Sequence, residues 1–170
     1  MIEFNRLSDA RRLEFISQRI GFALWQLQEL EGIAATYLVL TARATRGMGE
    51  VAGNALLEDA LSKPFGRTVR DLKKAGTLPA TLEDPTSRLL TERNWLVHRS
   101  RASSRSAVRR EDHCVALVSR IEAIGEEALA LMRQFGTLVE EFAKSNGVTS
   151  ETIEVESVAI LKRWHGGDAT

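Results

Sequence analysis

Two long stretches of the chain repeat hydrophobic or small residues at alternating spacings of three and four, the pattern of a helix with one buried face. The first stretch carries Leu13, Ile16, Ile20, Ala23, Leu27, Leu30, Ala34 and Tyr37. Ser8 and Asp9 precede it as start signals, so we expect one helix that ends at about Thr45. Gly21 and Gly32 interrupt this pattern, and we expect them to mark close approaches of another backbone rather than helix ends.

The same alternation returns late in the chain. It comprises Cys114, Leu117, Ile121, Ile124, Ala128, Leu131, Phe135, Leu138 and Phe142. The pair Asn146-Gly147 follows as a stop signal. Two long helices with matching hydrophobic seams predict an antiparallel pair as the backbone of the fold.

Three shorter helices are predicted between the two long ones. They are about Asn54 to Ser62, then Pro64 to Ala75 closed by Gly76, then Pro85 to Arg99 capped by Asp84. The serine-rich and arginine-rich segment Ser100 to Ser106 reads as a flexible basic loop. No window shows sustained period-two alternation, and residues 152–158 read equally well as a short helix. The predicted fold class is therefore all-α, an antiparallel helical bundle with two long helices and three or more shorter ones.

The length and composition favour one folded unit. A chain of 170 residues suits one domain, which we place at residues 1–165, with residues 166–170 as a disordered tail. Cys114 is the only cysteine, so no disulfide forms within the chain. The first twelve residues are charged where a signal peptide is apolar, and no run of about 18 apolar residues occurs. We expect a cytoplasmic protein that does not span a membrane.

Charge is balanced overall but unevenly placed. The chain has 23 basic and 23 acidic residues, so no global field attracts nucleic acid or membrane. One segment without any acidic residue contains Arg93, Arg99, Arg101, Arg105, Arg109 and Arg110. The local electrostatics of this segment favour the binding of phosphate.

The same segment begins with the most specific motif of the chain, Arg93-Asn94-Trp95-Leu96-Val97-His98. On a helix, Asn94 and His98 are four residues apart and share a face, whereas Arg93 lies about 140° away from His98. Only a long side chain or a partner subunit could therefore bring the guanidinium to the imidazole. Histidine titrates near neutral pH and suits proton transfer, and a guanidinium meets two phosphate oxygens at once.

The Arg-Asn-x-x-x-His motif near the end of a helix resembles the HEPN family, the higher eukaryotes and prokaryotes nucleotide-binding domains. The preceding segments Phe65-Gly66-Arg67, Leu72-Lys73-Lys74 and Leu89-Leu90-Thr91-Glu92 are similar to bacterial members. The resemblance implies a HEPN-like helical bundle and a metal-independent endoribonuclease that works as a homodimer, with the motifs of two subunits facing each other across one cleft. Members of this kind include toxins or defence components, and a nucleotidyltransferase-like antitoxin is the partner that the resemblance implies.

On this interpretation Arg93 and His98 are catalytic and Asn94 supports them. Glu92, Arg99, Arg101 and Arg105 are the candidate RNA contacts, and neither a metal nor a cofactor is expected. Two alternatives stay open at this point. Charged residues at a helix end are usually solvated, and a tryptophan such as Trp95 more often packs than stacks on a base. The whole chain could equally be a non-catalytic HEPN-like module that binds RNA, a nucleotide or a protein.

Overall fold

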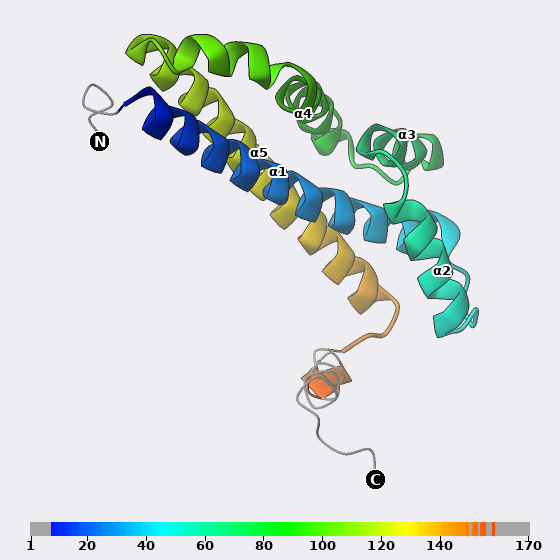
Figure 1. The fold of residues 1–170 in the computed structure, drawn as a ribbon. Helices are drawn as coiled ribbons and strands as arrows, with labels where there is room; N and C mark the ends of the chain where they lie inside the picture. Colours follow the sequence, from blue (N-terminus) through cyan, green and yellow to red (C-terminus); the bar gives the residue numbers. More distant parts are fainter. Residues whose placement is uncertain (1–7, 150, 153, 156–157, 159–170) are drawn as a thin grey trace.

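The protein is a bundle of helices in the computed structural model (Figure 1), which describes residues 8–149, 151–152, 154–155 and 158. The elements are α1 (Asp9–Leu38), the π-helical turn η2 (Val39–Arg43), α2 (Glu50–Leu61), α3 (Phe65–Ala75), α4 (Ala80–Ala107) and α5 (Glu111–Ser145). No strand occurs among the described residues, and those between 151 and 158 are helical. The all-α fold class is confirmed. The predicted tail, residues 166–170, lies outside the described residues.

Helix α1 follows its predicted boundaries closely. The Ser8 hydroxyl accepts a hydrogen bond from the Arg11 amide at 3.4 Å, which caps the first turn. The helix passes into η2 and ends at Arg43, near the predicted end. The prediction for its glycines was wrong, because a Cβ atom added at Gly21 or Gly32 would meet no neighbouring heavy atom within 4 Å.

The close approach between the long helices occurs instead at Gly125 of α5. A Cβ atom there would collide with the Gln26 side chain and come to 4.0 Å of the Ala23 backbone. Gly125 is buried, and its missing side chain lets α1 and α5 pack against each other. Sequence periodicity placed Gly125 inside a helix but did not reveal which glycine faces the partner helix.

Helices α1 and α5 lie side by side in Figure 1 and run in the same direction. Arg19 of α1 pairs with Glu122 of α5, and further along both helices the Tyr37 ring packs on Phe135 with ring centroids 5.9 Å apart. The residue numbers of both helices therefore rise together along the contact. The predicted antiparallel arrangement of these two helices was wrong, although the bundle does contain an antiparallel pair.

That antiparallel pair consists of α4 and α5. Arg88 pairs with Glu127, and Glu92 pairs with Arg120, so numbers rise on one helix as they fall on the other. Helix α4 spans 28 residues and returns the chain to the end of the bundle where α1 begins. Helix α5 must then start beside the start of α1, which explains why the two run parallel.

The length of α4 contradicts two predictions, because the helix begins before Pro85 and continues through the expected loop 100–106. Ser100 and Ser104 are buried rather than flexible. Their hydroxyls donate to the Leu96 and Ser100 carbonyl oxygens at 2.6 and 2.9 Å, so each buried polar group is satisfied within the helix. Small side chains here let the end of α4 lie close to the bundle.

The start of α4 also differs from the prediction. Pro79, not Asp84, precedes the first helical residue, and Pro85 lies inside the helix. Leu82 and Thr86, on either side of this proline, are both buried. Burial of these side chains offsets the amide hydrogen bond that the proline lacks. The helix is bent rather than straight in Figure 1.

The remaining helices complete one main core. Helix α3 ends at Gly76, whose φ of 68° is left-handed, and the Gly76 stop is confirmed. Helix α2 begins at Glu50, four residues before the prediction, and Ala60 packs with Ala35 and Val39 in a small second cluster. Among the described helices, none has the length and apolarity needed to cross a bilayer.

Candidate functional site

Helix α4 places four of the predicted site residues on one exposed face. Because α4 continues through the expected loop, these residues stay on one helix and fall within about 60° of one another around its axis. All four are exposed to solvent. They are Asn94, His98, Arg101 and Arg105, and we call them the outward stripe.

His98 points away from the bundle. It lies on the side of α4 opposite to the buried positions Leu96 and Ser100, which face the other helices. Across the part of the chain that the structure describes, neither His98 nor Asn94 forms a side-chain hydrogen bond or an ion pair. Val97, beside His98, is 43% exposed despite being hydrophobic. The imidazole is therefore accessible to a substrate or to a second subunit.

Arg93 occupies a different environment from His98. Its Nε atom donates to Oε1 of Glu31 on α1 at 3.1 Å, and both side chains are about one-quarter exposed. This direction faces α1, so the structure does not bring Arg93 and His98 together within one chain. The hydrogen bond uses only the Nε edge of the guanidinium, which leaves the terminal nitrogens available for an oxyanion.

Trp95 of the motif and Glu92, the residue before the motif, take part in packing. Nε and Nη2 of Arg120 on α5 donate to the two carboxylate oxygens of Glu92 at 2.8 and 3.1 Å. The same guanidinium lies 3.5 Å from the centroid of the Trp95 ring, and Trp95 packs against the main core. The packing interpretation of Trp95 is supported, and Glu92 has an intramolecular partner that an RNA contact would have to replace.

The predicted RNA contacts among the arginines are all exposed but do not share one face. Arg99 is the residue after His98 and lies about 100° from it, outside the outward stripe. Arg101 and Arg105 belong to the stripe and also line an open groove where α4 turns into α5. The structure therefore groups Arg101 and Arg105 with His98 and separates Arg99 from them.

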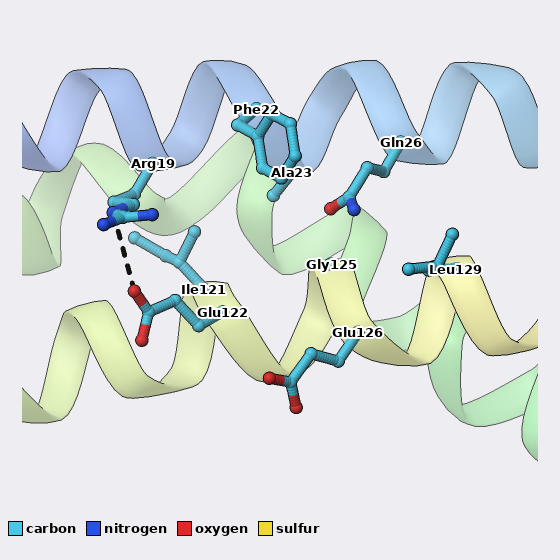
Figure 2. Close-up of a pocket in the computed structure, with 9 residues that line it drawn as sticks. All are labelled: Arg19, Phe22, Ala23, Gln26, Ile121, Glu122, Gly125, Glu126 and Leu129. Carbon is cyan, nitrogen blue, oxygen red and sulfur yellow. Dashed lines mark ion pairs between the residues drawn. The ribbon is translucent and has the colours of Figure 1, made fainter.

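A second hollow lies between α1 and α5, away from these arginines (Figure 2). Figure 2 shows Arg19 reaching Glu122, at 3.5 Å, while Gln26 lies over the backbone of Gly125. Phe22 at its edge is 54% exposed. Its polar side chains are of mixed charge and include no histidine, so it lacks the groups that the motif chemistry requires.

Sequence reasoning missed Glu31 and Arg120, which hold the side chains of Arg93 and Glu92. No signal in the sequence could have found them, because Glu31 is 62 residues from Arg93 and Arg120 is 28 residues from Glu92. Cys114, the first residue of the predicted late seam, is fully buried, and this burial raises the pKa of its thiol. Within the described residues, no group of three or more acidic, histidine or cysteine side chains is arranged to hold a metal ion.

No protein-family model, curated protein or solved structure matches this chain. The geometry of α4 and the chemistry of its side chains are therefore the observations that bear on its function.

Proposed function

We propose that this protein is a metal-independent endoribonuclease of the HEPN type that acts in the cytoplasm as a homodimer. Its substrate is single-stranded RNA, and its role is that of a toxin or defence component with a nucleotidyltransferase-like antitoxin as partner. The observation that carries the proposal is the outward stripe, which places a histidine without a partner among the described residues beside an amide and two arginines on one exposed helix face.

Each motif residue has a defined role in this reaction. His98 accepts the proton of the ribose 2′-hydroxyl, whose oxygen attacks the phosphorus, and the bond to the 5′-oxygen breaks as that oxygen receives a proton. The products are a 2′,3′-cyclic phosphate and a 5′-hydroxyl. Arg93 stabilises the negative charge on the phosphorus oxygens through its terminal nitrogens. Asn94, one turn before His98, orients the imidazole or the phosphate.

The reaction needs a second subunit because Arg93 faces α1 whereas His98 faces outward. A dimer that pairs the exposed faces of two α4 helices would cover Val97 and set two histidines in one cleft. Each His98 is then the base of its own site, and solvent supplies the proton that the leaving 5′-oxygen receives. The Arg93 guanidinium of one subunit reaches the phosphate held beside the His98 of the other.

The direct test measures cleavage of end-labelled single-stranded RNA in EDTA by the purified protein. We expect products that end in a 2′,3′-cyclic phosphate, and we expect His98→Ala to slow cleavage by about 10²- to 10⁴-fold, the range for loss of a general acid or base. His113→Ala is the matched control, because His113 lies on α5 outside the stripe. Circular dichroism should show equal helix content in all three proteins. Cleavage at the wild-type rate by His98→Ala would contradict the proposal.

A mixing experiment tests the composite site. Arg93→Ala and His98→Ala are each expected to be inactive alone. In a mixed dimer, the His98→Ala subunit still supplies Arg93 and the Arg93→Ala subunit still supplies His98. If each site takes its arginine and its histidine from different subunits, one of the two sites in this dimer is intact. Renaturing the two variants together should therefore restore part of the activity. No recovery in a mixture shown to contain mixed dimers would contradict the shared site.

A second candidate function is a non-catalytic HEPN-like module that binds RNA, a nucleotide or a protein partner through the same face. The ion pair between Arg93 and Glu31 favours it, because that pair holds the guanidinium away from His98. This candidate predicts RNA binding with no cleavage under any condition. The cleavage assay separates the two functions when it is run beside a binding titration.

A further inference from the structure

An open groove at the turn between α4 and α5 is lined by basic side chains with no acidic one among them. The residues that form its walls include Arg101, Arg105, Arg109, Arg110, Leu13 and Val108. Arg110 pairs with Asp112 at 2.7 Å, whereas Arg101, Arg105 and Arg109 form no ion pair with a described residue. Three neighbouring guanidinium groups without counterions form a surface suited to a polyanion.

A hydrogen bond between α1 and the turn after α4 holds the walls of the groove together. Nη1 of Arg12 donates to the Val108 carbonyl oxygen at 3.1 Å, which ties the first turns of α1 to the turn between α4 and α5. Leu13, next to Arg12, is 49% exposed and adds apolar surface to the basic wall. Phosphates would contact the arginines of such a groove, while a ribose or base would lie on the apolar part.

The groove is continuous with the outward stripe, because Arg101 and Arg105 belong to both. His98 and Arg105 are seven residues apart on α4, a separation of about 10 Å along the helix axis. A short piece of single-stranded RNA spans this distance. An RNA whose scissile phosphate lies at His98 would therefore place its neighbouring phosphates in the groove.

We infer that this groove binds the sugar-phosphate backbone of single-stranded RNA on one side of the bond that is cleaved. The inference rests on the proposed function and extends its site to Arg109 and to the start of α1. Contacts to phosphate hold an RNA in register but do not read its bases, so binding here is independent of sequence. Longer RNAs are bound more tightly than short ones because they reach the groove.

The experiment measures RNA binding in the His98→Ala background, so that the RNA stays intact. Fluorescence anisotropy follows a long single-stranded RNA, and a short one that cannot reach from His98 to the groove, over a range of salt concentrations. The double change Arg105→Gln with Arg109→Gln should reduce the salt dependence for the long RNA. The slope of the logarithm of the RNA-binding constant against the logarithm of salt concentration should become smaller in magnitude by about 1.4. This is about 0.7 for each lost phosphate contact.

The matched control is Arg70→Gln with Arg133→Gln, which removes two exposed arginines that lie outside the groove. We expect the control to leave the slope for the long RNA unchanged, and we expect the short RNA to show little dependence on either pair. An unchanged slope in the groove variant, or an equal decrease in the control, would overturn the inference. Circular dichroism of each variant shows whether the fold is intact.

The binding and cleavage experiments can overturn the groove inference and the nuclease proposal independently of each other. If wild-type protein cuts RNA and the groove variant keeps the full salt slope, only the groove inference is overturned. If the groove variant loses slope while wild-type protein never cuts RNA, the groove binds RNA and the nuclease proposal is overturned.

Discussion

The inward and outward faces of α4 differ in every property that matters for the function of this protein. The inward face carries Leu82, Thr86, Leu89, Leu96, Ser100, Ser104 and Ala107, all buried. The outward stripe carries Asn94, His98, Arg101 and Arg105, all exposed. One face stabilises the bundle and the other presents polar chemistry, so neighbouring residues of one motif have unrelated roles.

The two faces of α4 divide the six-residue motif Arg93 to His98, which looks like one unit in the sequence. Arg93 and Leu96 lie on the sides of α4 that meet other helices, Arg93 through Glu31 and Leu96 through the core. Asn94 and His98 lie on the outer side. A change at one motif position should therefore affect either stability or RNA chemistry, and three variants test this division.

The largest effect is expected for Leu96→Ala, since Leu96 is 1% exposed and packs in the main core. Removing its side chain leaves a cavity and should lower the free energy of unfolding by about 2 to 5 kcal/mol. Val97→Ala is the matched control on the outward side and should cost less than about 1 kcal/mol at concentrations where the protein is a monomer. Urea unfolding measures both. Equal losses in the two variants would show that the faces are not divided as described.

The sequence predicted the helices with regular hydrophobic spacing and failed where small polar residues replaced hydrophobic ones. Both seams contain large apolar side chains every three or four residues, so α1 and α5 were located closely. Ser100 and Ser104 lie at seam positions of α4, but serine is typical of loops, so the end of this helix was missed. The parallel arrangement of α1 and α5 was missed for the same reason.

The site was predictable only as far as one helix extends. The spacing of Asn94 and His98 placed them on one face, and the angle between Arg93 and His98 correctly separated those two. Arg101 and Arg105 joined the stripe only once α4 was known to continue past Arg99. The Glu31 contact depends on the packing of α1 against α4, which no local pattern encodes.

A smaller effect is expected for Glu31→Gln, which weakens the contact that orients Arg93. Glu31 touches no substrate in our proposal and acts as a positioning residue. Loss of orientation should lower kcat for RNA cleavage by about one order of magnitude while KM changes little, because small misplacements of a catalytic group are costly. Glu31→Asp keeps a carboxylate and should recover part of the lost kcat. A residue with a merely structural role would not give this recovery.

Glu29→Gln is the matched control for Glu31, because Glu29 is exposed on the same helix and no ion pair involves it among the described residues. It should leave kcat unchanged. If Glu31→Gln instead raises kcat, the ion pair holds Arg93 away from the substrate, and the positioning role is wrong.

The smallest effect is expected for Arg120→Gln, which removes the guanidinium between Glu92 and the Trp95 ring. Both charged side chains are substantially exposed, at 44% and 32%, so solvent screens the pair. The free energy of unfolding should fall by less than about 1 kcal/mol. Arg120→Lys should not restore it, since an ammonium group lacks the planar fork that bonds both carboxylate oxygens.

Arg133→Gln, an exposed change elsewhere on α5, should have no effect in the same urea titration. A loss above about 2 kcal/mol would mean that this contact belongs with the buried face of α4, and that Glu92 serves the fold rather than RNA.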